Sequence, residues 1–485
     1  MPDTAKAPPK HFVVIVPGIL GSRLRRTDTQ ELVWGDFRQM LSNPLQVRQR
    51  FQRMMESLVY PNPLEPDGIL DEVVVFPPLI EIGQYDRLVN YLHGQLGYSL
   101  TDGDPAVYAF GYDWRQDNRL SAEKLGEAID GWRAKHPGAE VWLLAHSNGG
   151  LVSRWYIEML GGKQWVTRFF ALASPRGGAP QALATALSGP KGVLRPAFAL
   201  LGIDTRPVVK TWPCLYQLLP HDAGFVTDSE NHAVNLFEDT DWLSEAEHRR
   251  LLQDARQFHA DLIAQESSPT ASHVETVCVY GTKNKTTTTG RLLATAGGWD
   301  VEWLTSEAGD GTVPVSSALH PTPVQFPVVA AHIDVYIHPQ TALLLEHELV
   351  TKYTAPERAF LETPLHAVQF EPTEKTYRPG ETVQVWATVT RRDDDTAVTD
   401  AVIAVTMEWR DPLPASPVSG PSGPLPTMTL ALNAASGRYE GALPAPAAEG
   451  YYTLVAHVTI PGPTPLDTEA VDLAELVVID SMSLE

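Results

Sequence analysis

The chain has 485 residues, of which 43% are hydrophobic and 20% are charged, and its formal net charge is -22 at pH 7. This length exceeds that of one small domain and predicts two. The excess of acidic groups argues against nucleic acid as a partner and against tight electrostatic docking on anionic membranes. A lipid substrate that is reached through an apolar surface stays compatible with this charge.

The two cysteines, Cys214 and Cys278, can form at most one disulfide, which excludes a secreted disulfide-rich scaffold. The N-terminal residues lack the apolar core of a secretion signal. No apolar run approaches the ~20 residues that a helix needs to span a bilayer. These features predict a cytoplasmic protein.

Residues 11–350 alternate short β-rich segments with helical patterns, which predicts a parallel sheet covered by helices. The expected strands are nearly continuous apolar runs, as is typical of strands buried on both faces. They are Phe12–Val16, Ala106–Phe110, Val141–Ala145, Phe169–Ala173, Val274–Tyr280 and Val324–Ala330. Apolar residues at helical spacing predict helices around 88–96 and 125–132.

The run from Ala145 to Gly150 (Ala-His-Ser-Asn-Gly-Gly) follows one of these strands and precedes a helical pattern. A strand, a sharp turn that carries a serine among small residues, and a helix form the nucleophile elbow of an α/β-hydrolase. The neighbours must be small because the serine occupies a strained turn between strand and helix. Ser147 is therefore the candidate nucleophile.

A nucleophilic serine needs a base and a carboxylate that holds the base, and α/β-hydrolases carry them in the chain order serine, acid, histidine. Asp310 is the predicted acid because it lies in a glycine-rich turn, Gly309–Pro314, after a strand. His332 is the predicted base because it directly follows the apolar run 328–331.

Other histidines compete with His332 or have structural interpretations. His320 is a nearby alternative base, and His347 lies within the helical pattern 343–349. His338 precedes Pro339 and can cap that helix. His146 stands beside the nucleophile, but its side chain should point elsewhere, so we expect a structural role.

The oxyanion of an acyl-transfer intermediate needs two preorganised N–H donors. Asn148, the residue after the nucleophile, should supply one. The other should come from the loop Val16–Gly21, where glycines free the backbone and Ile19 is the predicted donor. An ordinary Pro-Gly turn is the alternative for this loop.

No metal-ligand spacing and no nucleotide-binding glycine pattern appears in the sequence, so no metal and no cofactor is expected.

Two stretches interrupt the alternation of strands and helices, at residues 34–82 and 181–270. We expect them to form cap and lid insertions above the strand ends, where substrate pockets are built. Ordinary packing helices are an equally weighted alternative. The run Thr286–Thr289 predicts a solvated loop.

The sequence texture changes after about residue 360, where apolar and polar residues alternate with a period of two. About seven short strands separated by Pro, Gly and Asp turns predict an immunoglobulin-like β-sandwich over residues 361–485. The cysteine pair of antibody domains is absent. Residues 1–360 then form the α/β-hydrolase catalytic domain, with the linker near 355–365.

Several short motifs occur in one order along residues 11–350. They are Val14–Ser22, Tyr112–Arg115, the elbow at Ser147, Ser174–Gly178, Tyr216–Pro220, Tyr280–Thr282 and Gly309–Pro314. Together they make this part of the chain similar to the lecithin:cholesterol acyltransferase family, whose relatives include the lysosomal phospholipase and the phospholipid:diacylglycerol acyltransferases.

This resemblance implies an α/β-hydrolase core with a cap and a mobile lid, and acyl-ester chemistry on lipids without a metal. The residues that it implies are Ser147 as nucleophile, Asp310 as acid, His332 as base, Ile19 and Asn148 as oxyanion donors, and Trp34 in the acyl pocket. The chain departs from the family at Ala145, where Gly is usual, and at Asn148, where an apolar residue is usual. It also lacks the family's cysteine bridges, and its C-terminal sandwich has no counterpart there.

We therefore expect a serine lipase or phospholipase that hydrolyses acyl esters of lipids through an acyl-enzyme on Ser147. The same intermediate can pass its acyl chain to an alcohol, so an O-acyltransferase is the first alternative. The alternative of another class is an interaction or effector protein whose β-sandwich recognises a partner. Expected partners are the lipid or acyl ester, a transiently contacted lipid surface, and a protein bound by the β-sandwich.

Overall fold

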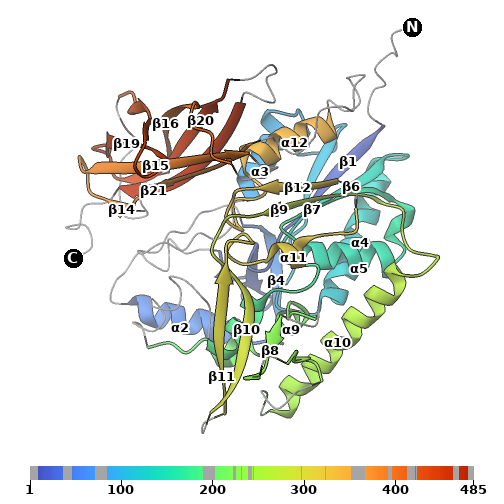
Figure 1. Ribbon diagram of the computed structural model, residues 1–485. Helices are drawn as coiled ribbons and strands as arrows, with labels where there is room; N and C mark the ends of the chain where they lie inside the picture. Colours follow the sequence, from blue (N-terminus) through green and yellow to red (C-terminus); the bar gives the residue numbers. More distant parts are fainter. Residues whose placement is uncertain are drawn as a thin grey trace. The chain divides into compact units, whose positions relative to one another are not determined.

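The structure is a computed structural model with two compact units, Ala7–Ile337 and a second unit that contains His338–Glu485 (Figure 1). It describes residues 9–35, 46–70, 85–188, 202–221, 225–230, 232–238, 243, 245–295, 298–322, 324–350, 366–374, 376–391, 396–411, 421, 423–461 and 469–478. The linker expected at 355–365 lies outside these residues, as do parts of both expected insertions, at 36–45, 71–84 and 189–201.

The first unit is built on a six-stranded sheet in the order β12-β9-β7-β6-β1-β5, in which every neighbouring pair is parallel. Its strands are β1 (His11–Val16), β5 (Ala106–Ala109), β6 (Glu140–His146), β7 (Val166–Leu172), β9 (Glu275–Gly281) and β12 (Val324–Val328). They are the six strands that the sequence predicts. Because the strands are parallel, their carboxyl ends meet at one edge of the sheet, which is where α/β proteins place ligands.

Helices pack against this sheet. The longer ones are α3 (Tyr85–Gly94), α4 (Asn118–Lys135), α5 (Asn148–Met159), α6 (Pro180–Ser188) and α10 (Ala246–Glu266). The side chain of Asp117 caps α4 by accepting from the backbone N–H of Arg119. Helix α5 is buried from Asn148 to Ile157 because it lies between the sheet and helices α4 and α10 (Figure 1).

The described part of the first insertion contains α2 (Val47–Ser57) and β4 (Leu64–Ile69). A small antiparallel sheet joins β4 to two strands that precede the insertion, β2 (Ser22–Arg26) and β3 (Leu32–Trp34). Strand β2 pairs with both β3 and β4. Helix α2 buries Phe51, Met54 and Met55 and exposes its polar face.

The second insertion contains the short elements α8 (Arg206–Val209), α9 (Pro213–Gln217) and β8 (Val226–Thr227). Two other short elements lie outside it, η2 (Gly162–Gln164) before β7 and α11 (Val315–Ala318) before β12. Strand β8 pairs with β10 (Thr286–Thr295), which forms an antiparallel hairpin with β11 (Gly298–Ser306) (Figure 1).

The prediction of a solvated loop at Thr286–Thr289 is wrong, because this run forms the first part of β10. Thr286 and Thr287 are 0% and 2% exposed. β-Branched threonines suit a strand, and a hydroxyl can be buried once it has a partner. The Thr286 hydroxyl donates to the carbonyl of Asn284 at 2.8 Å.

The second unit begins with α12 (Pro339–Leu349), which the ring of His338 caps as predicted by accepting from the Gln340 N–H. Two sheets follow. The first has the order β13-β15-β19-β18, with β13 (His366–Pro372), β15 (Thr382–Arg391), β19 (Arg438–Pro444) and β18 (Ala431–Asn433). The second has the order β14-β21-β20-β16-β17, with β14 (Thr376–Tyr377), β21 (Glu469–Val478), β20 (Gly450–Thr459), β16 (Val402–Asp411) and β17 (Thr427–Thr429).

The C-terminal sheets are antiparallel, apart from the parallel pair of β14 with β21. They contain nine strands in the described residues, against about seven expected. Val383, Val385 and Val389 are buried at alternate positions of β15, which confirms the period of two. The immunoglobulin-like assignment stays a prediction.

Candidate active site

Ser147 lies between the end of β6 and the start of α5, with φ 52° and ψ -126°. A residue other than glycine is strained at this positive φ, so the surrounding packing must hold it there. Packing around the turn is tight. A β-carbon at Gly149 would collide with the carbonyl of Val16, and one at Gly150 would collide with the Ser174 side chain. The small residues of the elbow are therefore required by contact as well as by conformation.

The three residues predicted as nucleophile, base and acid form a continuous hydrogen-bonded relay. The Nε2 atom of His332 lies 2.9 Å from Ser147 Oγ, and its Nδ1 atom lies 2.8 Å from Asp310 Oδ2. Ser147 is 6% exposed and Asp310 is 2% exposed. This arrangement lets the imidazole take a proton from the serine while the carboxylate fixes the ring's tautomer and orientation.

The turn that carries Asp310 is held by backbone and side-chain hydrogen bonds. Asp310 Oδ1 accepts from the N–H groups of Thr312 at 2.9 Å and Val313 at 2.7 Å. The Gly311 N–H donates to Thr286 Oγ1 at 2.7 Å, and the His332 N–H donates to the Asp310 carbonyl at 2.8 Å. Strand β10 therefore supports the candidate acid, a role that the sequence prediction missed for Thr286.

The loop after β1 lies against the nucleophile. A β-carbon at Gly18 would lie 2.8 Å from that of Ser147, so only glycine permits this approach. The Gly18 N–H is already taken by the Tyr85 hydroxyl at 2.8 Å. The backbone N–H groups of Ile19 and Asn148, the two predicted oxyanion donors, have no acceptor among the residues that the structure describes.

The side chain of Asn148 explains how a polar residue fits where the family has an apolar one. It exchanges two amide hydrogen bonds with Asn118, at 2.9 and 3.0 Å, and both residues are fully buried. Its Nδ2 atom also reaches the hydroxyl of Tyr112 at 3.2 Å, and that hydroxyl donates to the Pro17 carbonyl at 2.9 Å. The network joins the elbow, helix α4 and the loop after β1, and it leaves no amide atom of Asn148 unpaired.

Trp34 contacts the same loop. Its indole N–H donates to the Leu20 carbonyl at 2.8 Å, and its ring packs edge-to-face on Trp114 at 5.5 Å. Trp34 is 5% exposed. The structure thus places it beside the loop that carries Ile19, and its part in an acyl pocket stays a prediction.

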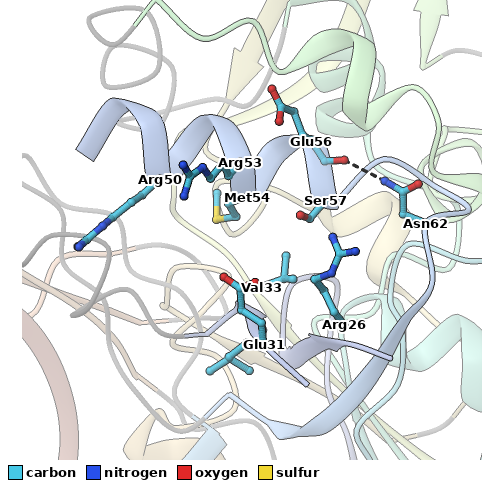
Figure 2. Close-up of a pocket in the computed structure, with 10 residues that line it drawn as sticks. Arg26, Glu31, Val33, Arg50, Arg53, Met54, Glu56, Ser57 and Asn62 are labelled. Atoms are coloured by element: carbon cyan, nitrogen blue, oxygen red, sulfur yellow. Dashed lines mark hydrogen bonds between the residues drawn. The ribbon is translucent and has the colours of Figure 1, made fainter. Parts of the chain in front are cut away.

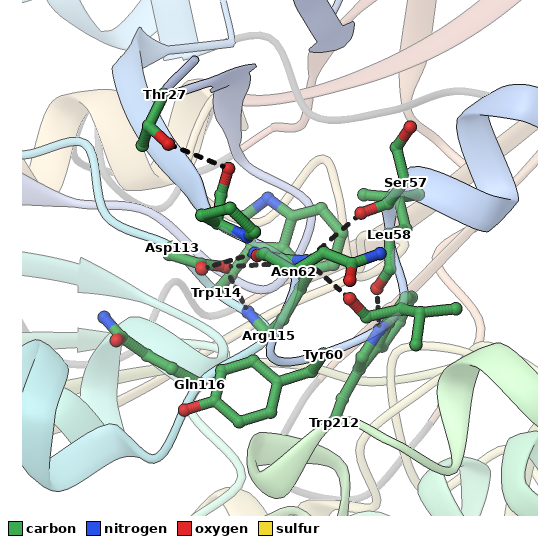
Figure 3. Close-up of polar contacts among 12 residues, drawn as sticks. Thr27, Ser57, Leu58, Tyr60, Asn62, Asp113, Trp114, Arg115, Gln116 and Trp212 are labelled. Atoms are coloured by element: carbon green, nitrogen blue, oxygen red, sulfur yellow. Dashed lines mark hydrogen bonds and ion pairs between the residues drawn. The ribbon is translucent and has the colours of Figure 1, made fainter.

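Arg115 connects the first insertion to the core (Figure 3). Its guanidinium is fully buried and makes a bidentate ion pair with Asp113, at 2.9 and 2.8 Å. The remaining N–H groups donate to the carbonyls of Asn62 at 2.9 Å, Val59 at 3.2 Å and Ser57 at 3.4 Å. One side chain therefore fixes the whole turn after α2.

A cavity of about 490 Å³ lies between α2 and the β2–β3 strands (Figure 2). Its lining residues are Arg26, Glu31, Leu32, Val33, Arg50, Arg53, Met54, Glu56, Ser57 and Asn62. Figure 2 shows Arg50 and Arg53 on α2 and Arg26 with Glu31 opposite them. Arginines beside apolar side chains can hold a phosphate or carboxylate that carries an apolar tail.

Neither cysteine takes part in the site. Cys214 and Cys278 are both buried and form no disulfide, and burial raises the pKa of the Cys278 thiol to about 11.

No group of three or more His, Cys, Asp or Glu side chains is placed to hold a metal ion in the described ranges. Among the helices of those ranges, none combines the length and apolar composition needed to cross a bilayer.

Comparison with known proteins finds a family match that includes Ser147 and ends before Asp310 and His332. Residues 80–254 match the model of the lecithin:cholesterol acyltransferase family. Comparison with curated proteins found no match. Among solved structures, the Tle4–Tli4 complex superposes with a TM-score of 0.51 and 15% identity, over 72% of this chain and 99% of that chain. This likeness shows a shared fold.

Two further solved structures have lower scores. The mature lipase BlEst2 of Bacillus licheniformis has a TM-score of 0.33 and 14% identity, over 73% of this chain and 95% of that one. Phospholipase PlaB of Legionella pneumophila has a TM-score of 0.29 and 10% identity, over 96% of this chain and 90% of that one.

Proposed function

We propose that this chain, whose residues 80–254 match the model of the lecithin:cholesterol acyltransferase family and whose first unit has the α/β-hydrolase fold, hydrolyses acyl esters of lipids. The observation that carries the proposal is the relay of 2.9 and 2.8 Å through Ser147, His332 and Asp310 at the carboxyl edge of the parallel sheet. A serine, a histidine and an aspartate in this order have no structural reason to align beside a strained turn, whereas acyl transfer requires it.

In the proposed reaction, His332 Nε2 takes the Ser147 proton while Ser147 Oγ bonds to the ester carbonyl carbon. The negative oxygen that results accepts hydrogen bonds from the N–H groups of Ile19 and Asn148. Loss of one such donor lowers the rate by about 10²–10³-fold. When the intermediate collapses, the ester C–O bond breaks and His332 returns its proton to the leaving alcohol. Water then repeats these steps on the acyl-enzyme and releases the fatty acid.

Among lipid esters, we propose phospholipids ahead of neutral acylglycerols. The cavity beside α2 supports this choice because three of its side chains are arginines in a chain of net charge -22. Arg26 is paired with Asp28, whereas Arg53 has no ion-pair partner among the described residues. Strand β3 connects the cavity to the site, since Val33 lines the cavity and the next residue, Trp34, bonds the Leu20 carbonyl.

The test is to treat the purified full chain with a fluorophosphonate, locate the adduct by peptide mass, and measure fatty acid release from phosphatidylcholine vesicles and from triacylglycerol emulsions. We expect the adduct on Ser147 and its loss, with turnover, in Ser147→Ala. Ser153→Ala is the matched control, because Ser153 is a buried serine within the helix that follows Ser147, and the serine hydrogen-bonded to His332 Nε2 is Ser147. Equal turnover in the wild type and Ser147→Ala would overturn the proposal.

Transfer of the acyl chain to an alcohol is the second candidate, favoured by the acyltransferase family match. The same assay with an added long-chain alcohol separates the two reactions. Free fatty acid as the main product supports hydrolysis, and a new ester formed at the expense of fatty acid supports transfer. No adduct and no release, with detergent or vesicles present, would favour the third candidate, a protein whose C-terminal sheets recognise a partner.

A further inference from the structure

We propose that His146 and Tyr85 are positioning residues that hold the oxyanion loop and the base in one arrangement, an inference that rests on the proposed function. Three hydrogen bonds join these parts. The Gly18 N–H donates to the Tyr85 hydroxyl at 2.8 Å, and that hydroxyl lies 2.6 Å from His146 Nδ1. On the other side of the ring, His146 Nε2 lies 3.0 Å from the carbonyl oxygen of His332.

The donor and acceptor of each of these three hydrogen bonds follow from the backbone groups at the two ends of the series. A backbone N–H can only donate, so the Tyr85 oxygen accepts from Gly18 and its own proton is available to His146 Nδ1. Nδ1 is then the acceptor, and the ring proton stays on Nε2. The carbonyl of His332 can only accept, which is the partner that an Nε2–H requires. One neutral tautomer of His146 therefore satisfies all three bonds at once.

The surroundings keep His146 in this neutral form. Tyr85 and His146 are 2% and 5% exposed. Burial, and to a smaller extent the neighbouring His332, holds the pKa of His146 well below its usual value. The ring of Tyr336 stacks on Tyr85 at 4.8 Å and lies 4.7 Å from the ring of His146. The ring of His332 lies 4.9 Å from that of His146, and a proton that His332 takes up in the proposed reaction repels a second positive charge on His146, so His146 stays neutral.

The arrangement gives consecutive residues two separate contacts to the base. Ser147 reaches the His332 ring, while His146 reaches the His332 backbone. The same His146 is tied through Tyr85 to Gly18, the residue before the predicted donor Ile19. Loss of the Tyr85 hydroxyl would leave a buried N–H and a buried ring nitrogen without partners and free the loop from the base. Misplacement of a catalytic group by about 1 Å costs about 10²-fold in rate.

The chain offers a matched control for this test. His11 Nε2 and the Tyr98 hydroxyl form a second buried Tyr–His bond of 2.6 Å. It lies at the amino end of β1, whereas the site lies at the carboxyl end. Tyr98→Phe therefore removes an equally short and equally buried bond without touching the site.

The experiment compares Tyr85→Phe, Tyr98→Phe and wild type for kcat, KM, fluorophosphonate labelling rate and thermal midpoint. We expect Tyr85→Phe to lose about 10–100-fold in kcat and labelling rate with KM within about threefold, and Tyr98→Phe to lose stability only. Unchanged kcat in Tyr85→Phe, or equal losses in both variants, would overturn the inference. Turnover in Ser147→Ala would instead overturn the proposed function.

A second pair of variants covers the case in which Tyr85→Phe does not fold. His146→Gln keeps an amide that can accept from Tyr85 and donate to the His332 carbonyl, whereas His146→Leu keeps the volume and loses both bonds. We expect the glutamine variant to retain at least about tenfold more kcat than the leucine variant. Equal activity of the two would show that His146 only fills space.

Discussion

Replacement of Arg115 by methionine tests whether one buried side chain fixes the first insertion. Arg115 is fully buried, and its guanidinium is the ion-pair partner of Asp113, which is 9% exposed (Figure 3). Methionine preserves much of the aliphatic volume and removes every hydrogen bond. Asp113 would then be a buried carboxylate without its cation.

The expected loss follows from what remains unpaired. Removal of one partner of a buried ion pair costs about 3–5 kcal/mol, mostly because the other charge stays buried. The carbonyls of Val59 and Asn62 also lose their donors, but these residues are half-buried and exposed, so water can replace the guanidinium there. We therefore expect a decrease of about 3–4 kcal/mol in the free energy of unfolding. Arg115→Lys, which keeps the charge but not the planar fork, should lose about 2 kcal/mol.

The assay is urea unfolding of the full chain followed by tryptophan fluorescence, since Trp114 lies next to Arg115 and packs on Trp34. The double variant Asp113→Leu with Arg115→Met is the control, because it removes the stranded charge and should recover most of the loss. A loss below about 1 kcal/mol in Arg115→Met, or no recovery in the double variant, would refute the reasoning.

Three further changes probe the acid, the elbow and the buried histidines. Asp310→Asn should lower kcat by about 10³–10⁴-fold with the fold retained in circular dichroism, because the amide favours the wrong tautomer of the base; a loss below tenfold would contradict this. Gly150→Ala should lower the free energy of unfolding by about 1–3 kcal/mol, because its β-carbon would collide with Ser174. Gly131→Ala is the control, with nothing within 4 Å of the new carbon, and should raise the free energy of unfolding by up to about 1 kcal/mol. Urea midpoints that shift in the same direction in both variants would contradict this prediction. Burial lowers the pKa of His320 well below 6.5, so below pH 6.5 this histidine binds a proton in the unfolded chain but not in the folded one. The free energy of unfolding should therefore decrease as the pH drops below 6.5, by up to about 1.4 kcal/mol per pH unit. His320→Phe should flatten this dependence between about pH 7.5 and about pH 5 in urea titrations, and an unchanged slope would exclude His320 as its source.

The central sheet could be predicted because each of its strands is recognisable from its own residues, without knowledge of distant contacts. The runs that became β1, β6 and β7 are mostly apolar and short, as is typical of strands buried on both faces. The approach of His332 to Ser147 could be predicted for the same reason, since His332 follows β12 and parallel strands end at one edge. Asp310 follows β11, which lies outside the central sheet, so its approach was predicted from its glycine-rich turn and its place in the chain. Chain order then left few choices.

The parts that could not be predicted depend on contacts between distant segments. Tyr85 is 61 residues from His146, and nothing around it marks a hydroxyl that bonds both Gly18 and that ring. The threonine run at 286–289 has the composition of a loop, and only the pairing of β10 with β11 decides otherwise. Arg115 was visible only as part of a family motif, because its partners are carbonyl groups, which have no sequence signature.

The distance along the chain between nucleophile and base has a consequence for synthesis. His332 lies 185 residues after Ser147, and Asp310 lies between them. At ~5–20 residues per second, a ribosome needs about 10–40 s to add this stretch. On the proposed mechanism, a growing chain that already displays its serine has no base to activate it. On that mechanism, the chain stays without esterase activity during synthesis, and activity begins only after β12 and the His332 that follows it have been added and have folded onto the first unit.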